Sequence, residues 1–154
     1  MMPRMRIAIA GDHNGLLMKA TLVEWLTADG HQVDDRGTHG AEIVDYPPLC
    51  ADVARQVLGG HAERGIVIGG TGGGEAIASN KIRGIRAGLC HSTFLAEISS
   101  AHNNTNVLVL GAKVIGPAEA VAITSTWLST PFKGERHQRR LDQIAALERG
   151  EPLH

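Results

Sequence analysis

Short apolar runs alternate with helical segments along this chain, and that alternation limits its possible folds more than any other feature. The clearest run is Gly65–Ile68 (GIVI), which is typical of a strand buried on both faces of a parallel sheet. Further strands are predicted at Arg6–Ala10, Gln32–Asp35, Arg86–Cys90 and Val107–Leu110. Helices are predicted between Leu16 and Gly30, at Leu49–Leu58, from about Glu75, at Thr93–Ala101, at Pro117–Leu128 and at Glu135–Arg149.

Parallel strands need crossover connections, and helices usually provide them. The pattern therefore predicts the α/β class, as an open, Rossmann-like parallel sheet of five strands with helices on both faces. The last helix, Glu135–Arg149, has no strand after it, and its apolar stripe must pack on its own sheet or on a partner subunit. We expect the partner subunit, which makes a homodimer the expected assembly.

Composition and charge narrow the class of protein. A chain of 154 residues, with 43% hydrophobic and 20% charged residues, predicts one globular domain over residues 1–154. The net charge of -1 gives no general attraction to nucleic acid or to anionic membranes. Two cysteines, no leader-like apolar start and no run near the roughly 20 residues of a membrane helix predict a cytoplasmic protein.

The loops that follow the predicted strands carry the polar residues of interest. In open α/β sheets, ligands bind beyond the carboxyl ends of the strands. Those loops hold Asp12 with His13, the segment Gly69–Glu75, His91 with Ser92, and Lys113. We therefore expect these side chains to gather at one edge of the sheet.

The segment Gly69–Glu75 (GGTGGGE) is the strongest single motif. It places unobstructed backbone N–H groups at a helix start, where they bind an anion or a developing oxyanion. It lacks the Gly-Lys-Ser/Thr ending of a P-loop and lies in the wrong place for a dinucleotide fingerprint. The alternative is a tight turn without a ligand. Glu75 is either a catalytic base or a carboxylate favoured by the helix dipole.

The other candidates are weaker when taken singly. Asp12 and His13 either contact a sugar hydroxyl and an anion, or Asp12 caps the next helix. His102 is a candidate acid or base, with turn-forming asparagines after it. Arg136 and Arg140 share one helix face and either bind a phosphate or are solvated. The chain has no HExxH and no CxxC motif, so we expect no metal.

Together these residues resemble one family closely. The B-type ribose-5-phosphate isomerases, with their galactose-6-phosphate and allose-6-phosphate isomerase relatives, match nearly the whole chain. The matching motifs are Gly11-Asp12-His13 with Gly15, Asp45-Tyr46-Pro47, Gly69–Glu75, Ser79-Asn80-Lys81, Gly84–Ala87, His102–Asn106 and Arg136–Arg140.

The resemblance implies a metal-free aldose–ketose isomerase that needs no cofactor and belongs to carbohydrate metabolism, in the pentose phosphate pathway. Such an enzyme opens the furanose ring and moves a proton between C2 and C1 through a cis-enediolate. One form of the family has a cysteine base where this chain has Gly70, and the other has a glutamate at the end of the glycine loop. The resemblance therefore implies that Glu75 is the base, and that neither Cys50 nor Cys90 is catalytic.

The same resemblance implies a role for each remaining site residue. Thr71, Gly72 and Gly74 would stabilise the enediolate; His102 with Asp12 would open the ring; Tyr46 and Asn103 would contact the sugar; and His13, Arg136 and Arg140 would bind the phosphate. It also implies a homodimer or a dimer of dimers with sites shared between subunits. The sequence does not assign these residues to subunits.

One departure concerns the substrate. The family commonly has an arginine where this chain has Lys113, which replaces a bidentate donor by a point charge. The expected reaction interconverts D-ribose 5-phosphate and D-ribulose 5-phosphate, with Lys113 still contacting the substrate. The alternatives are an isomerase of allose 6-phosphate, galactose 6-phosphate, a tetrose phosphate or an unphosphorylated sugar, and a binding module without catalysis.

Overall fold

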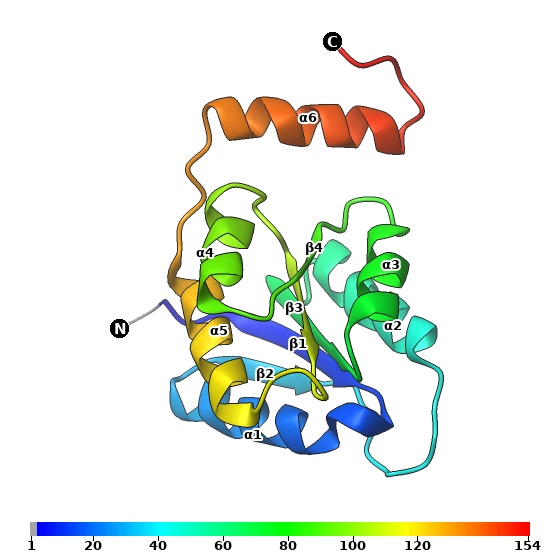
Figure 1. Cartoon of the computed structure of the whole chain (residues 1–154), viewed down its shortest axis with the longest axis vertical. Helices are drawn as coiled ribbons and strands as arrows, with labels where there is room; N and C mark the ends of the chain where they lie inside the picture. Colours follow the sequence, from blue (N-terminus) through cyan, green and yellow to red (C-terminus); the bar gives the residue numbers. More distant parts are fainter. Residues whose placement is uncertain (1–2) are drawn as a thin grey trace.

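Five parallel strands form one sheet at the centre of the molecule, in the order β2-β1-β3-β5-β4 (Figure 1). The computed structural model describes residues 3–154. The strands are β1 (Arg6–Gly11), β2 (Gln32–Asp35), β3 (Arg64–Gly69), β4 (Ala87–Leu89) and β5 (Val107–Gly111). The predicted open, parallel α/β architecture is confirmed.

In residues 3–154, six α-helices connect and follow the strands. They are α1 (Leu16–Ala28), α2 (Tyr46–Leu58), α3 (Gly73–Asn80), α4 (Thr93–Ala101), α5 (Pro117–Ser129) and α6 (Arg136–Glu148), and a short 3-10 turn, η1 (His13–Gly15), precedes α1. Helix α2 begins three residues earlier than predicted, because Pro47 and Pro48 are compatible with a first helical turn, where no N–H is needed. Strand β4 is shorter than predicted and excludes Arg86 and Cys90.

The two faces of the sheet carry different side chains. Ile7 and Ile9 of β1 lie in the core beneath α1 and α5, whereas Ala8 and Ala10 lie in the core beneath α2. This alternation follows from the pleat of a strand, in which successive side chains point to opposite faces. The small residues on the second face allow α2 to approach the sheet closely.

The direction in which successive strands are added to the sheet reverses between β1 and β3. From β1 the chain moves outward to β2, and it then returns to the other side of β1 to form β3. Gly11 at the end of β1 is paired with Ile68 near the end of β3. The loops after these two strands therefore lie side by side, at the position where open α/β sheets bind ligands.

Helix α6 lies across the opposite, amino end of the sheet, away from the other helices (Figure 1). Glu148 accepts a hydrogen bond from the Gly84 N–H at 3.1 Å. Leu141 is buried, but Ile144 and Leu147 are 50% and 62% exposed. The apolar stripe of α6 is therefore only partly covered by its own chain. Within residues 3–154, no helix is long and apolar enough to cross a bilayer.

Candidate active site

Asp12 lies at the carboxyl end of β1, in the crevice between β1 and β3. Its backbone N–H donates to the Ile68 carbonyl at 3.1 Å, which continues the strand pairing by one residue. Its buried carboxylate accepts from the Asn14 N–H at 2.9 Å and from the Asn14 side-chain amide at 3.3 Å. Asp12 therefore does cap η1, and its position also brings a carboxylate into the crevice.

The glycine loop turns sharply from β3 into α3. Gly72 has a φ of +84°, a left-handed conformation that glycine adopts without strain. The Thr71 hydroxyl accepts from the Gly73 N–H at 3.2 Å. Helix α3 begins at Gly73, two residues earlier than predicted. The N–H groups of its first turn have no carbonyl partner within the helix and can donate to a ligand.

Glu75 occupies the first turn of α3 and is only 3% exposed. Its carboxylate lies directly against the Gly69 backbone, so that any Cβ at that position would overlap with it. A side chain at residue 69 would thus exclude the carboxylate from the end of β3. The glycine is required by contact here, since Gly69 is not among the glycines with positive φ.

The environment of Glu75 favours proton transfer. Burial raises the pKa of this carboxyl group above its ordinary value of 4.5, and the nearby Asp12 carboxylate raises it further. A base whose pKa lies closer to neutral transfers protons more effectively at physiological pH. The Glu75 carboxylate therefore has the properties of a general base, in addition to a favourable place in the first helical turn.

His13 and Tyr46 border the same crevice. The Tyr46 ring and hydroxyl lie against Gly74, where a Cβ would overlap them. The Val44 N–H donates to His13 Nδ1 at 3.4 Å. An open cavity of about 650 Å³ is lined by Asp12, His13, Tyr46 and their neighbours. Two candidates from separate loops thus meet beside Asp12.

Lys113 lies over the glycine loop. Its backbone N–H donates to the Gly70 carbonyl at 2.9 Å. If residue 70 carried a Cβ, that atom would lie 3.6 Å from Lys113 Cδ and 3.4 Å from the side-chain amide nitrogen of Asn14. Gly70 is therefore flanked by Lys113 and by Asn14, which is not among the site residues predicted above. The position of Asn14, two residues after Asp12, is the sequence signal that could have identified it as a site residue.

Neither cysteine has the environment of a reactive thiol. Both Cys50 and Cys90 are buried, and burial raises the pKa of the Cys50 thiol to about 11. The pKa of Cys90 is also raised by burial. Cys50 Sγ donates a hydrogen bond to the backbone carbonyl of Glu75 at 3.8 Å. A thiol at such a pKa stays protonated near neutral pH, so Cys50 packs behind the site without activating a substrate.

The remaining four candidates lie at the other edge of the sheet. His102 follows the end of α4 and precedes β5, and Asn103 comes next to it. Strand β5 separates this position from the carboxyl edge by about 16 Å. Arg136 and Arg140 lie on α6. One chain therefore forms two polar groups, which we call the carboxyl-edge group (Asp12, His13, Tyr46, Thr71, Gly72, Gly74, Glu75 and Lys113) and the amino-edge group (His102, Asn103, Arg136 and Arg140).

His102 of the amino-edge group is stacked on a second imidazole, that of His137. The rings of His102 and His137 lie 4.0 Å apart and 12° from parallel. The pKa of His137 is lowered by burial and by nearby positive charge from His102, Arg136 and Arg140. In the sequence, His137 is present only as an unassigned residue of the Arg136–Arg140 motif. Its position next to Arg136 did not indicate which face of the helix it occupies.

In the described part of the chain, no group of three or more His, Cys, Asp or Glu side chains is arranged to hold a metal ion. The carboxyl-edge group consists of two buried carboxylates, an imidazole, an ammonium group, backbone amides and hydroxyl groups. This arrangement suits removal of a proton from carbon beside an oxygen that gains negative charge.

Comparison with known proteins agrees with this chemistry. A family model described as Ribose/Galactose Isomerase matches residues 7–144. The ribose-5-phosphate isomerase B of Escherichia coli is 43% identical over 143 residues, which cover 93% of this chain and 96% of the relative. The corresponding enzyme of Mycobacterium leprae is 37% identical over 150 residues, which cover 96% of this chain and 93% of the relative.

Solved structures match equally well. Ribose-5-phosphate isomerase B from Clostridium thermocellum superposes with a TM-score of 0.93 at 44% identity, covering 95% of this chain and 99% of the other. The Mycoplasma genitalium enzyme, solved with bound ribulose-5-phosphate, gives a TM-score of 0.89 at 36% identity, covering 94% of this chain and 96% of the other. With this fold, this buried glutamate and these relatives, the chain belongs to the ribose/galactose isomerase family.

Proposed function

We propose that the protein is an aldose–ketose isomerase that interconverts D-ribose 5-phosphate and D-ribulose 5-phosphate. The observation that carries the proposal is the buried Glu75 carboxylate beside the glycine loop, with a raised pKa and backbone amides within the same turn. The bound ribulose-5-phosphate of the Mycoplasma genitalium relative supports this substrate. The likeness extends over nearly the full length of that enzyme.

In the proposed reaction, the Glu75 carboxylate removes the proton from C2 of the open-chain aldose and returns it to C1, while the hydroxyl proton passes from O2 to O1. Between these two steps the substrate is a cis-enediolate, whose negative charge is on oxygen. The hydroxyl of Thr71 and the amides of Gly72 and Gly74 would donate to that oxygen. Such donors accelerate the reaction because they bind the charge that develops in the transition state more strongly than the neutral substrate.

No electron leaves the substrate in this sequence of steps, because the hydrogen lost from C2 is regained at C1. The reaction therefore needs no redox cofactor, and we propose that residues 1–154 act as one cofactor-free, metal-independent isomerase domain. The matching relatives of similar length support a single catalytic domain. We place the enzyme in the cytoplasm and in pentose phosphate metabolism.

We propose further that the active site is completed by a second copy of this chain. The carboxyl-edge and amino-edge groups lie on opposite edges of one sheet, so one copy cannot present both to one substrate. In a homodimer, or in a dimer of dimers, His102 of one subunit would open the sugar ring beside Asp12 of the other. Asn103 and Tyr46 would contact the sugar, while His13, Arg136 and Arg140 would bind the phosphate.

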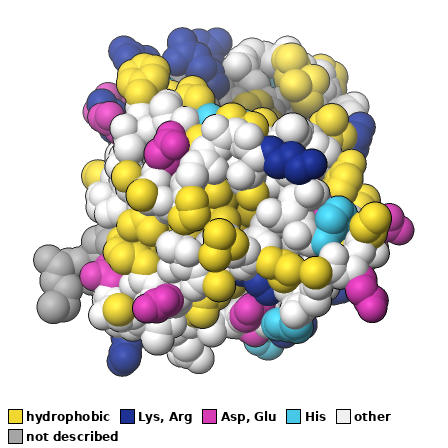
Figure 2. All heavy atoms as spheres, turned by 60° about the horizontal axis from the view of Figure 1, so that its bottom comes forward, with side chains coloured by type: hydrophobic (Ala, Val, Ile, Leu, Met, Phe, Trp, Pro, Cys, Tyr) yellow, Lys and Arg dark blue, Asp and Glu magenta, His cyan; other side chains and the backbone are white. Residues whose placement is uncertain are grey.

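Exposed apolar side chains near the carboxyl edge support this assembly. Leu17 at the start of α1, Phe94 at the start of α4 and Val114 after β5 are 73%, 67% and 50% exposed. Figure 2 brings the lower side of Figure 1 forward and shows hydrophobic side chains gathered across the middle of that face. Apolar surface of this kind, together with the partly uncovered stripe of α6, is typical of protein–protein contact.

Lys113 supports a second candidate, an isomerase that acts on another sugar. Its side chain lies beside Gly70, where a flexible ammonium replaces the planar, bidentate guanidinium that is common in the family. Allose 6-phosphate, galactose 6-phosphate, a tetrose phosphate or an unphosphorylated sugar would then be the substrate. The chemistry at Glu75 would be unchanged. A binding module without catalysis would have no use for the buried base.

A substrate panel tests these alternatives. The protein, purified with a chelator, would be assayed for isomerisation of ribose 5-phosphate, allose 6-phosphate, erythrose 4-phosphate and free ribose. We expect the highest kcat/KM with ribose 5-phosphate. Activity on a different sugar alone would move the substrate and keep the mechanism, and binding of sugar phosphates without turnover would overturn the proposed enzyme.

A further inference from the structure

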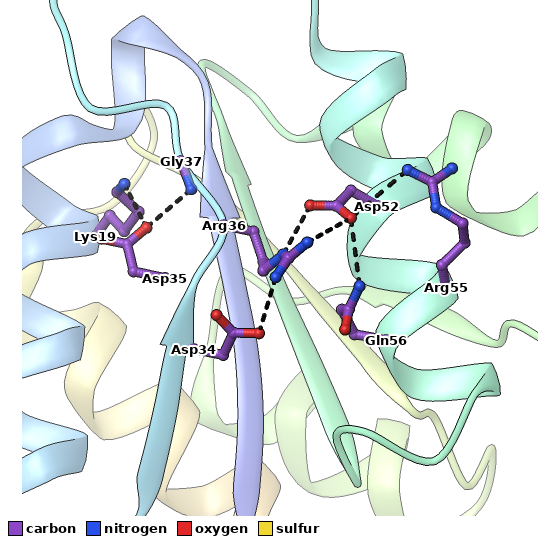
Figure 3. Close-up of polar contacts among 8 residues, drawn as sticks. All are labelled: Lys19, Asp34, Asp35, Arg36, Gly37, Asp52, Arg55 and Gln56. Carbon is purple, nitrogen blue, oxygen red and sulfur yellow. Dashed lines mark hydrogen bonds and ion pairs between the residues drawn. The ribbon is translucent and has the colours of Figure 1, made fainter.

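A sharp corner follows β2 and leads toward Tyr46. Residues 35–38, which we call the corner, are held from both helical layers by ion pairs (Figure 3). Lys19 of α1 contacts the corner on one side of the sheet, and Asp52 of α2 contacts it on the other. None of these charged residues takes part in the proposed chemistry.

Lys19 is the unusual member of this arrangement, because it is only 4% exposed. Its ammonium donates to Asp35 Oδ1 at 2.7 Å and to the Thr38 carbonyl at 2.6 Å. The same Asp35 oxygen accepts from the Gly37 N–H at 3.0 Å. A buried ammonium is unfavourable unless it is paired and hydrogen-bonded. Both partners of Lys19 belong to the corner, so the lysine fixes that segment and no other.

The corner is bonded in turn to the last residue before Asp12. The Gly11 N–H donates to the Gly37 carbonyl at 2.8 Å, and the Thr38 N–H donates to the Gly11 carbonyl at 2.7 Å. These two bonds close a short pairing between the corner and the end of β1. A displacement of the corner would therefore be transmitted to Asp12 and His13.

The loop that runs from the corner to Tyr46 is also held at its Tyr46 end. Arg36 forms two hydrogen bonds with the Asp52 carboxylate, at 2.8 and 3.1 Å, and Asp52 lies on the helix that begins at Tyr46. The Val44 N–H approaches His13 Nδ1 at 3.4 Å. The loop that carries Tyr46 is thus anchored at the corner, at His13 and along α2.

We propose that Lys19 and Asp35 are positioning residues for substrate binding. Their ion pair holds the corner so that His13 and Tyr46 keep the spacing that the sugar phosphate requires. Since Glu75 follows a different strand, loss of the pair would weaken substrate binding more than it would slow the proton transfer. This inference rests on the proposed roles of His13 and Tyr46.

The test compares the single variants Lys19→Met and Asp35→Asn with the double variant. Each single variant leaves one partner without its counter-charge and would lower Tm, whereas the double variant removes both charges and would regain stability. We expect the KM for ribose 5-phosphate to rise about tenfold in all three, with kcat within about threefold of the parent. Glu151→Gln, which breaks the exposed Arg149–Glu151 pair (2.8 Å), is the matched control and leaves KM unchanged.

The double variant shows whether the Lys19–Asp35 pair positions the substrate-binding residues or only stabilises the fold. If its KM returns to the parental value together with its Tm, the pair serves only stability and the inference is overturned. Amide exchange over residues 37–45 gives a second readout, and we expect faster exchange in the double variant than in the control. Absence of isomerase activity in the parent would count against the proposed function, whereas unchanged exchange in the double variant would count against the corner as a positioning device.

Discussion

The two polar groups of this protein are built in different ways, although both lie at the strand ends of the same sheet. The carboxyl-edge group is organised around backbone: its glycines, its helix-start amides, and Gly69, against which the Glu75 carboxylate is buried. In the amino-edge group, long side chains such as Arg136 extend from α6, and His102 stacks on His137. The first group is set by strand pairing within one chain, and the second depends on how α6 is placed.

This difference indicates which part of the reaction each group can support. Proton transfer at carbon requires a fixed distance and a dry base, and the buried Glu75 meets both needs. Capture of a mobile anion requires charge and reach, which guanidinium groups supply.

Replacement of Glu75 by glutamine should remove the base while keeping the shape of the carboxyl-edge group. We expect kcat to fall by a factor on the order of 10³, with the affinity for inorganic phosphate unchanged. A variant with near-parental kcat would contradict the proposed role of Glu75.

The same variant has a stability signature. Because the pKa of Glu75 is raised in the folded protein, its stabilising contribution is present below its ordinary pKa of 4.5 and is lost as pH rises through the folded pKa. At neutral pH the glutamine variant should therefore melt at a higher temperature than the parent. A calorimetric comparison at pH 7 and near pH 4 checks this, and the difference should shrink at the lower pH.

Replacement of His102 by asparagine should affect the amino-edge group alone. We expect a loss of about 10²-fold with the cyclic substrate, and a smaller loss with an open-chain analogue, because ring opening is an acid–base step. Equal losses with both substrates would remove the ring-opening role.

Mixed dimers test whether both groups contribute to one active site. Subunits with Glu75→Gln and subunits with His102→Asn, unfolded and refolded together, would form some dimers in which one site has both intact groups. For random pairing we expect about one quarter of the parental activity. No recovery above the separate variants would show that each site is formed by a single chain.

Replacement of Gly74 by alanine should disturb the carboxyl-edge group without changing its charge. The new methyl group would overlap the Tyr46 hydroxyl and displace that ring, so we expect KM to rise about tenfold. Gly40→Ala is the control in a neighbouring loop, because no atom lies within 4 Å of its Cβ position and its φ is not positive. An unchanged KM in the Gly74 variant would mean that Tyr46 does not bind the sugar.

The smallest expected effect concerns acid stability. The pKa of Asp52 is held below its ordinary value of 3.8, chiefly by its hydrogen bonds with Arg36. Its contribution is therefore present above pH 3.8 and is lost as pH falls through the folded pKa. Arg36→Met should reduce stability by about 0–1 kcal/mol at pH 7. Denaturant unfolding of the parent and the variant at pH 7 and pH 3 measures this loss of stability, which should be smaller at the lower pH.

Much of the fold and of the carboxyl-edge group could be predicted because their signals are local. The run Gly65–Ile68 and the glycines after it specify a buried strand and a tight turn within a few residues. The early start of α2 is harder to predict, because Pro47 and Pro48 are as compatible with a loop as with the first turn of a helix.

Contacts between distant residues were not predictable in this way. Lys19 and Asp35 are 16 residues apart, and their side chains meet only after α1 has packed on the sheet. The stack of His102 on His137 likewise depends on the path of the chain after α5. The separation of the two polar groups did have a signal, since His102 comes before a strand whereas Asp12 and Glu75 come after one.

The burial of His137 among positively charged side chains determines how the net charge of α6 changes with pH. Because its pKa is lowered below the ordinary 6.5, this imidazole is mostly neutral at pH 7. The positive charge of α6 then comes from arginines, whose guanidinium groups stay protonated throughout the physiological range. A modest fall or rise in the pH of the surroundings would therefore leave the attraction of this helix for an anion nearly constant.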